Sequence, residues 1–426
     1  MEKDLTSGNV WKNILYFSLP YLLSYFLQTL YGMADLFIVG QFDGVASTTA
    51  VSIGSQVMHM LTVMIVGLAM GTTVTIGRAV GAGDSKKVSK TVGNTTVLFL
   101  GVSILLAGML LFLVRPIVSV MSTPTEAVDG TIRYLTICFI GIPFITAYNV
   151  IASIFRGMGD SKSPMYFIAL ACVINIGLDY LFMGAMHMGP AGAALGTTLS
   201  QTISVIISLW VILKKQTGIT MKKADFSPEK QTMGQVLKIG IPIAAQDGFI
   251  QIAFIIITII ANRRGLSAAA AVGIVEKIIS FLFLVPSSML STVSALGAQN
   301  MGAGKYDRAD QILRCAMGIA VGFGVCVAVL IQFIAEPVVG LFTTDTMVVI
   351  LGAQYIRGYI WDCIFAGMHF SFSGYFCAYG KSEISFIHNL IAILCVRIPG
   401  CILLRSFSQI RCFLWDWQQR RDLCFP

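Results

Sequence analysis

The chain has 426 residues, of which 56% are hydrophobic and 12% charged, and its formal net charge is +8. Soluble domains carry roughly 25% charged residues, so this composition excludes an ordinary soluble enzyme. Long apolar runs with few charges are typical of membrane spans of about 20 residues. We therefore expect an all-α polytopic membrane protein. The positive charge falls in the loops between the apolar runs and gives little support to a nucleic-acid partner.

Eleven apolar runs are clear enough to be predicted as membrane spans. In chain order they lie at residues 14–40, 50–76, 91–114, 131–155, 165–186, 190–213, 238–261, 268–295, 312–335, 346–371 and 384–404. A short polar leader precedes the first run, and no small-residue cleavage site follows it. The first run therefore reads as a retained span and not as a signal peptide.

Glycine and proline recur at one fixed distance along the chain. The Gly-Ala-Gly at 81–83 returns 221 residues later at 302–304, Pro116 returns as Pro337, and Pro20 matches Pro242 with a one-residue slip. Such an offset predicts two copies of one architecture. Because it spans about six helices, the copies should be parallel six-helix lobes around a central cleft. We assign 1–213 to the N-lobe, 214–237 to a cytoplasmic linker, 238–404 to the C-lobe and 405–426 to a polar tail.

Lysine and arginine indicate the orientation. They gather before the first span and after the even-numbered spans, whereas the loops after spans one, five and nine have none. The exceptions are Arg115, Arg133, Arg263 and Arg264. The positive-inside rule then places the N-terminus in the cytoplasm of a multi-pass protein of the cell membrane.

Polar side chains inside the first six spans form a candidate ion site. They are Gln28, Tyr31 and Asp35 in the first span, Asn175 and Asp179 in the fifth, and Thr197 in the sixth. Within each of the first two groups the spacing places the side chains on one helix face. Carboxylate, amide and hydroxyl oxygens suit Na⁺, and desolvated carboxylates that lie close together also hold protons. The residues alone do not separate the two ions. A competing interpretation makes Asp35 and Asp179 solvated capping residues at helix ends.

The second half offers a different polar set, which we assign to a substrate cleft. Its members are Gln246, Asp247, Glu276 and Asp362. None lies at the repeat offset from Asp35 or Asp179, so ion chemistry is expected mainly in the N-lobe. Lys277 follows Glu276, and a local compensated pair is the alternative there.

These residues resemble the multidrug and toxic compound extrusion (MATE) family. The resemblance covers about 1–400 and rests on Pro20, Asp35, the Asn175–Asp179 pair, the Gly-Ala-Gly loops and the stretch 156–160, Arg-Gly-Met-Gly-Asp. It implies a twelve-helix antiporter, not an enzyme, that exports small cationic or amphipathic drugs in exchange for Na⁺ or H⁺ and needs no other cofactor.

The resemblance also implies roles for residues. Pro20 would bend its helix as the acidic site loads. Asp35, Asn175, Asp179 and Thr197 would bind the coupling ion, and Gln28, Tyr31 and Asn149 would lie beside them. In the C-lobe, Asp247, Glu276 and Asp362 resemble positions used by some branches only. The remaining partner is membrane lipid, and a monomer is expected.

Two other functions remain open. A flippase for lipid-linked precursors would need a more cationic cleft for pyrophosphate, following the Arg and Lys preference of phosphate sites. An intramembrane protease is remote: Gly157-Met158-Gly159-Asp160 matches a GxGD string, but its repeat partner at 378–381 has no aspartate. The four histidines show no ligand spacing, so no structural metal site is expected.

The end of the chain does not continue the repeat. The offset predicts a twelfth span from about 411, yet residues 405–426 carry four arginines and two aspartates. That charge excludes a conventional span. We expect a frame shift between about 401 and 411 to have destroyed a twelfth helix, with a functional short tail as the alternative.

Overall fold

The structure is a computed structural model, and it describes residues 5–214, 221–262 and 266–391. Every regular element in these ranges is helical, which confirms the all-α prediction. The long helices are α1 (Val10–Phe42), α2 (Val45–Gly81), α3 (Ser85–Val120), α4 (Val128–Gly157), α5 (Lys162–Asp179), α6 (Gly189–Lys214), α7 (Lys230–Asn262), α8 (Leu266–Leu282), α9 (Leu284–Gly302), α10 (Tyr306–Gly340), α11 (Thr346–Tyr359), α12 (Asp362–Ala378) and α13 (Ser382–Ile391). Three short helices are η1 (Thr125–Ala127), η2 (Tyr180–Ala185) and η3 (Lys223–Phe226).

Nine helical segments in the described residues are long and apolar enough to cross a membrane. Two predicted spans are interrupted. The span predicted at 268–295 breaks at Phe283 between α8 and α9, and the one at 346–371 breaks between Tyr359 and Asp362. Proline explains the first break, because the ring of Pro286 clashes with the carbonyl four residues earlier, at Leu282, where α8 ends.

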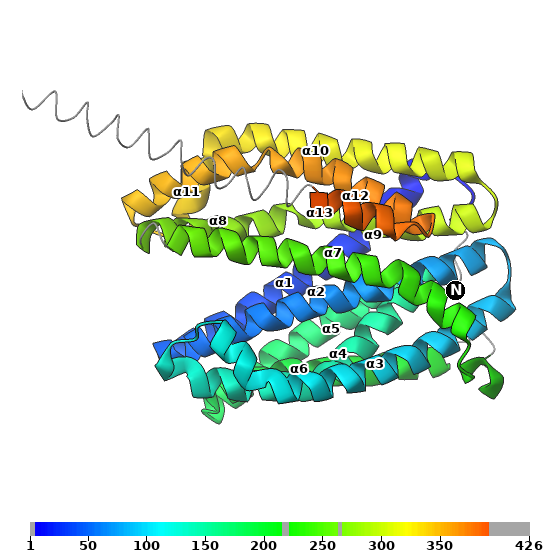
Figure 1. The fold of residues 1–426 in the computed structure, drawn as a ribbon. Coiled ribbons are helices and arrows are strands. Elements are labelled where there is room, and N and C mark those ends of the chain that lie inside the picture. Colours follow the sequence, from blue (N-terminus) through cyan, green and yellow to red (C-terminus); the bar gives the residue numbers. More distant parts are fainter. Residues whose placement is uncertain (1–4, 215–220, 263–265, 392–426) are drawn as a thin grey trace, which may run out of the picture.

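The helices form two lobes, α1–α6 and α7–α13, which lie one against the other in Figure 1. Helix α2 joins them by packing on α7 and α9. Glycines make this contact close: Gly71 packs on the carbonyl of Val236, and Gly240 on the carbonyl of Leu68. The missing side chains let two backbones meet directly, as small residues do between membrane helices.

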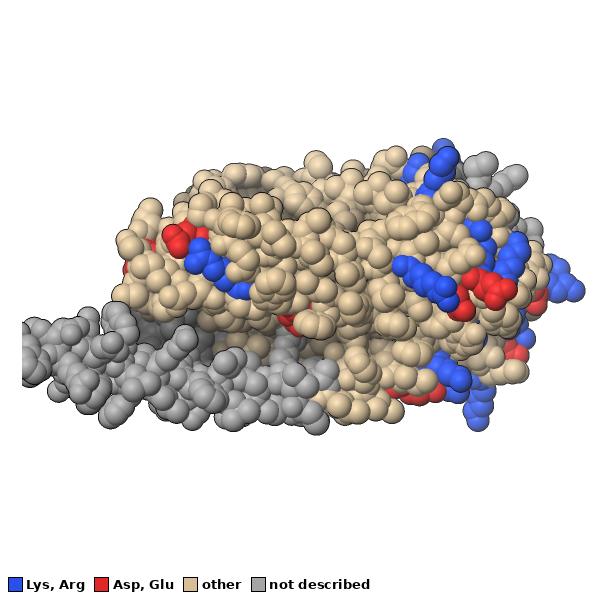
Figure 2. Space-filling model, turned by 90° about the horizontal axis from the view of Figure 1, so that it is seen from above, with Lys and Arg blue, Asp and Glu red and all other residues tan. Residues whose placement is uncertain are grey.

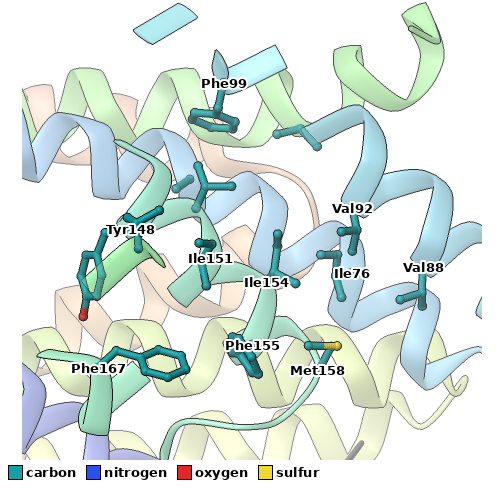
Figure 3. Close-up of a cluster of buried hydrophobic side chains, with 14 of the residues drawn as sticks. Ile76, Val88, Val92, Phe99, Tyr148, Ile151, Ile154, Phe155, Met158 and Phe167 are labelled. Atoms are coloured by element: carbon teal, nitrogen blue, oxygen red, sulfur yellow. The ribbon is translucent and has the colours of Figure 1, made fainter. Parts of the chain in front are cut away.

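The N-lobe core gathers around α4. Figure 3 shows Ile151, Ile154 and Phe155 of this helix among buried side chains from α2, α3 and α5. The rings of Phe155 and Phe167 meet edge to face with centroids 5.7 Å apart. Such aromatic contacts contribute about 0.5–1.5 kcal/mol beyond area burial. This core fixes α5 and α6, which carry half of the candidate ion site.

The second half of the inter-lobe segment lies against α3. Lys90 Nζ is 2.7 Å from Glu229 Oε1. The Glu229 amide donates to Asn94 Oδ1 at 2.7 Å, and Asn94 Nδ2 donates to the Asp225 carbonyl at 3.2 Å. Helix α7 starts at Lys230, inside the stretch that the sequence assigned to the linker. The chain from Asp225 to Glu229 is thus attached to the N-lobe.

Charged side chains are unevenly distributed. On the face shown in Figure 2, most Lys and Arg gather at one end of the bundle. Arg156 follows the fourth predicted span, where a loop is expected, but its side chain is buried. Its guanidinium carbon lies 5.0 Å from the centre of the Tyr21 ring. A cation over an aromatic face is held by the ring quadrupole.

The unusual C-terminus lies outside the described residues. Residues 392–426 include most of the span predicted at 384–404, the position expected for a twelfth helix and the polar tail at 405–426. Helix α13 covers only the start of the eleventh predicted span.

Candidate functional site

The centre of the candidate site is Asp35 on α1, whose side chain is buried. Thr197 on α6 donates a hydrogen bond from Oγ1 to Asp35 Oδ2 at 3.1 Å. The other carboxylate oxygen, Oδ1, has no hydrogen-bond partner among the described residues. Asp35 lies well inside its helix, which ends at Phe42. The structure therefore contradicts the alternative that Asp35 is a solvated cap.

Asp179 and Asn175 lie beside Asp35. Both are on α5, both are fully buried, and both interact with Asp35. Neither oxygen of Asp179 has a hydrogen-bond partner among the described residues. Asp179 ends α5 but stays inside the protein, because the π-helical turn η2 continues the chain. Such turns are often found at functional sites.

A glycine makes room for this carboxylate. Gly196 on α6 lies directly against Asp179 Oδ1, and the position that a Cβ would take is 3.6 Å from Asn175 Nδ2. Any larger residue at 196 would compete with the carboxylate for space. Gly196 and Thr197 are consecutive, so one turn of α6 both admits Asp179 and binds Asp35.

A wider polar shell surrounds the acids. Tyr31 interacts with Asp35, Gln28 and Gln201. Tyr134 and Cys138 on α4 also lie within electrostatic range of Asp35. Sequence analysis missed Gln201, although its i+4 spacing from Thr197 is a detectable signal. Tyr134 and Cys138 carry no such signal, because no polar residue of α4 at helical spacing from them indicates an ion site.

Two predicted N-lobe residues show local bonding. The Asn149 amide donates to the Ile145 carbonyl of its own helix at 2.8 Å, a bond that helix-packing residues also make. Helix α1 continues through Pro20, and Ser24 Oγ donates to the Pro20 carbonyl at 2.8 Å. Proline has no N–H, so the helical turn that precedes Pro20 lacks one backbone hydrogen bond. The Ser24 hydroxyl adds a hydrogen bond on the following turn. Bending at Pro20 stays a prediction.

The C-lobe residues do not join the acids of the N-lobe into one cluster. Gln246 is fully buried and accepts a hydrogen bond from Ser385 at 2.7 Å. Asp247 faces α2: its Oδ2 lies 2.9 Å from the position a Gly67 Cβ would take. Glu276 is on α8, and Asp362 is the first residue of α12. Asp247 is thus a carboxylate at the contact between the lobes.

The histidines meet in a way their spacing did not indicate. His369 on α12 and His388 on α13 have their Nδ1 atoms 3.1 Å apart. In the described part of the chain, no three His, Cys, Asp or Glu side chains are arranged to hold a metal.

The negative charge of Asp35 and Asp179, with no basic side chain in the part of the chain that the structure describes bound to either, decides what the acidic site can bind. The Lys90–Glu229 and Arg357–Glu336 ion pairs lie away from Asp35 and Asp179, and in the described residues Asp35 Oδ1 and both oxygens of Asp179 have no hydrogen-bond partner. Two buried carboxylates without a basic partner are strongly unfavourable unless a cation or a proton neutralises them. The oxygens of Asp35, Asp179 and Asn175 are a donor set that fits either.

Known proteins resemble the chain over nearly its whole length. The MatE family model matches twice, at residues 20–181 and 242–403, which agrees with the internal repeat. The probable multidrug resistance protein YpnP of Bacillus subtilis (strain 168) is 30% identical over 408 residues, covering 95% of this chain and 90% of that protein. The multidrug export protein MepA of Staphylococcus aureus (strain NCTC 8325 / PS 47) is 24% identical and covers 97% of this chain and 92% of its own length.

A solved structure has the same fold. It is an outward-facing conformation of a multidrug resistance MATE family transporter, with a TM-score of 0.86 at 24% identity, and the match covers 92% of this chain and 88% of that one. The twofold match of the family model and the two lobes agree with each other and with the repeat of 221 residues. This chain is therefore a polytopic membrane transporter of the MatE family, the multidrug and toxic compound extrusion proteins.

Proposed function

We propose that this chain exports lipophilic cations in exchange for Na⁺ or H⁺, and that the coupling ion binds at Asp35, Asn175, Asp179 and Thr197. The observation that carries the proposal is the pair of buried carboxylates, Asp35 and Asp179, with no basic partner in the described residues. Names of relatives such as the multidrug export protein MepA support the substrate class.

Exchange follows from the charge of the pair. An empty site carries unfavourable buried negative charge, and an ion or a proton relieves it. A ligand shifts an equilibrium between two states only by its differential affinity for them. Loading the pair would favour the lobe arrangement that has low affinity for the exported cation, and rocking of the lobes would alternate access.

The exported compound would lie nearer the lobe contact. Asp247 at that contact would attract a cation, and Gln28, Tyr31 and Gln246 would offer polar groups near it. Glu276 and Asp362 extend this proposed substrate set along the C-lobe. We further propose a cytoplasmic N-terminus in the cell membrane, a monomer, and no cofactor apart from the coupling ion.

Ethidium efflux from pump-deficient cells tests the proposal. The parent chain should export ethidium, and Asp35→Asn should abolish export at equal membrane abundance. Asp129→Asn is the matched control, because Asp129 is an exposed carboxylate in the first turn of α4 of the same lobe. Vesicles given either a Na⁺ or a pH gradient would identify the ion. Because the expected frame shift would by itself explain a parent that exports nothing, a frame-restored chain is tested beside it. A well-folded, frame-restored chain that exports nothing under either gradient would contradict the proposal and favour the flippase alternative.

A further inference from the structure

At one end of the bundle, Arg78 and Gln299 donate hydrogen bonds that cross between the lobes, two from Arg78 and one from Gln299. Arg78, near the end of α2, donates from Nε and Nη2 to the carbonyl of Ala378, the last residue of α12, at 2.9 and 2.6 Å. Gln299, near the end of α9, donates from Nε2 to the carbonyl of Gly157, the last residue of α4, at 3.0 Å. The two Arg78 bonds are donated by the N-lobe to the C-lobe, and the Gln299 bond is donated by the C-lobe to the N-lobe.

The Arg78–Ala378 and Gln299–Gly157 contacts are copies of each other under the internal repeat. The offset of 221 residues takes Arg78 to Gln299, and it takes Gly157 to Ala378. Donor and acceptor positions are therefore both conserved between the halves of this chain, although the donor is arginine in one half and glutamine in the other. Chance contact between two lobes would not match at both ends of both contacts.

The acceptors are carbonyls that their own helices leave free. At the C-terminus of α4, the backbone amides of Gly159 and Asp160 cap the helix by donating to the carbonyls of Arg156 and Phe155. Helix α12 is capped in the same way by the amides of Gly380 and Lys381. Gly159 and Gly380 have φ values of +87° and +67°, the left-handed cap that glycine allows. The capping bonds do not use the carbonyls of Gly157 and Ala378, which accept their hydrogen bonds from the opposite lobe.

The surrounding contacts follow the same symmetry. Gly81 packs on the Gln299 carbonyl, and its repeat partner Gly302 packs on the Arg78 carbonyl. Gly77 meets Ala298, its own repeat partner, with 3.1 Å between the Ala298 Cβ and the position a Gly77 Cβ would take. The pseudo-twofold axis of the fold therefore passes between Gly77 and Ala298, with the Arg78–Ala378 and Gln299–Gly157 contacts on either side of it.

We propose that Arg78 and Gln299 form a symmetric latch that holds the lobes together at this end and must open in the transport cycle. This inference rests on the proposed function only in that alternating access requires the lobes to separate here. The Arg78 half is the stronger, because its bonds are charge-assisted and meet the negative end of α12. The latch lies at the end of the glycine loops, which is the cytoplasmic end in the proposed orientation.

The latch is tested by measuring lobe separation directly. Spin labels on unnatural amino acids at Lys86 and Asp307, both exposed and related by the repeat offset, report the distance between the lobes without touching native cysteines. In the purified full chain, without drug or gradient, Gln299→Leu should raise the separated population about fivefold, the effect of one ordinary hydrogen bond. Arg78→Ala should raise it more, Arg78→Lys less than Arg78→Ala, and the double variant most.

Lys381→Ala is the control, because Lys381 is exposed next to Gly380 and only its backbone takes part in the cap. It should leave the distances unchanged. If both single variants fold and their distance distributions equal the parent's, the pair is a static packing contact and the latch is wrong. Should the double variant not fold, the two single variants still decide. Because the distances need no transport, an inactive frame-restored chain would refute the proposed function and leave the latch to be judged on its own data.

Discussion

The hydroxyl of Thr197 on α6 binds the carboxylate of Asp35 on α1 at 3.1 Å, although 162 residues separate them in the chain. This bond joins the first and last helices of the N-lobe at the point where Asp179 enters from α5. It leaves Asp35 Oδ1 without a hydrogen-bond partner in the described residues, and in the proposed function this oxygen would face the coupling ion.

Replacing the hydroxyl should weaken ion binding selectively. Thr197→Val keeps the branched shape but removes the donor. Because hydrogen bonds to charged groups contribute about 1.5–3 kcal/mol, the affinity for the coupling ion should fall roughly tenfold to a hundredfold. Ion titration of the purified protein measures this. Thr202→Val is the control on the same helix, since Thr202 Oγ1 bonds only to the Thr198 carbonyl. Equal losses in both variants would argue against a role for Thr197.

A methyl group at Gly196 should disable the site without touching an acid. Gly196→Ala places a Cβ against Asp179 Oδ1, so the carboxylate must leave its present position beside Asp35 and Asn175. We expect coupled efflux to fall as far as in Asp179→Asn. Gly177→Ala is the matched change on α5, because nothing lies within 4 Å of a Cβ there. Normal efflux by Gly196→Ala would show that the position of Asp179 is not critical.

The acid at the lobe contact should act on the substrate and not on the ion. Asp247→Asn removes a charge that faces α2 and lies outside the Asp35 cluster. The KM for ethidium efflux should rise about tenfold, in line with loss of one charged interaction, while ion affinity measured without drug stays unchanged. A parallel drop in ion affinity would place Asp247 in the coupling site instead.

Attachment of the inter-lobe segment should depend on pH. Hydrogen bonds from Lys90 and Thr232 lower the pKa of the Glu229 carboxyl. A lowered folded-state pKa means that this attachment contributes stability above the ordinary Glu pKa of about 4.3 and loses it as pH falls through the lowered value. At pH 7, Glu229→Gln should speed tryptic cleavage after Lys222 and Lys223. Glu336→Gln, which removes the Arg357–Glu336 ion pair, should not. Equal cleavage of the parent and Glu229→Gln would show that the salt bridge does not hold the segment.

Much of the fold could be predicted from the pattern of residues. Apolar runs located the first six spans, which correspond one to one to helices α1–α6, and the spacing of glycines revealed the repeat that the family model then matched twice. The break at Phe283 was missed, because Pro286 was hidden within an apolar run. The sequence also counted Arg156 among loop charges, whereas the fold buries it against Tyr21.

The sequence by itself determined that the chain is a polytopic helical membrane protein, that its helices come in two copies, and that Asp35 and Asp179 lie within or at the end of apolar runs. Hydropathy and residue spacing are local properties, so both can be read directly from the amino-acid sequence. Only the tertiary structure decided that Thr197 binds Asp35, that Gly196 admits Asp179, and that Arg78 meets a carbonyl 300 residues away. Those contacts depend on how helices rotate and approach one another, and packing of many small side chains sets both together.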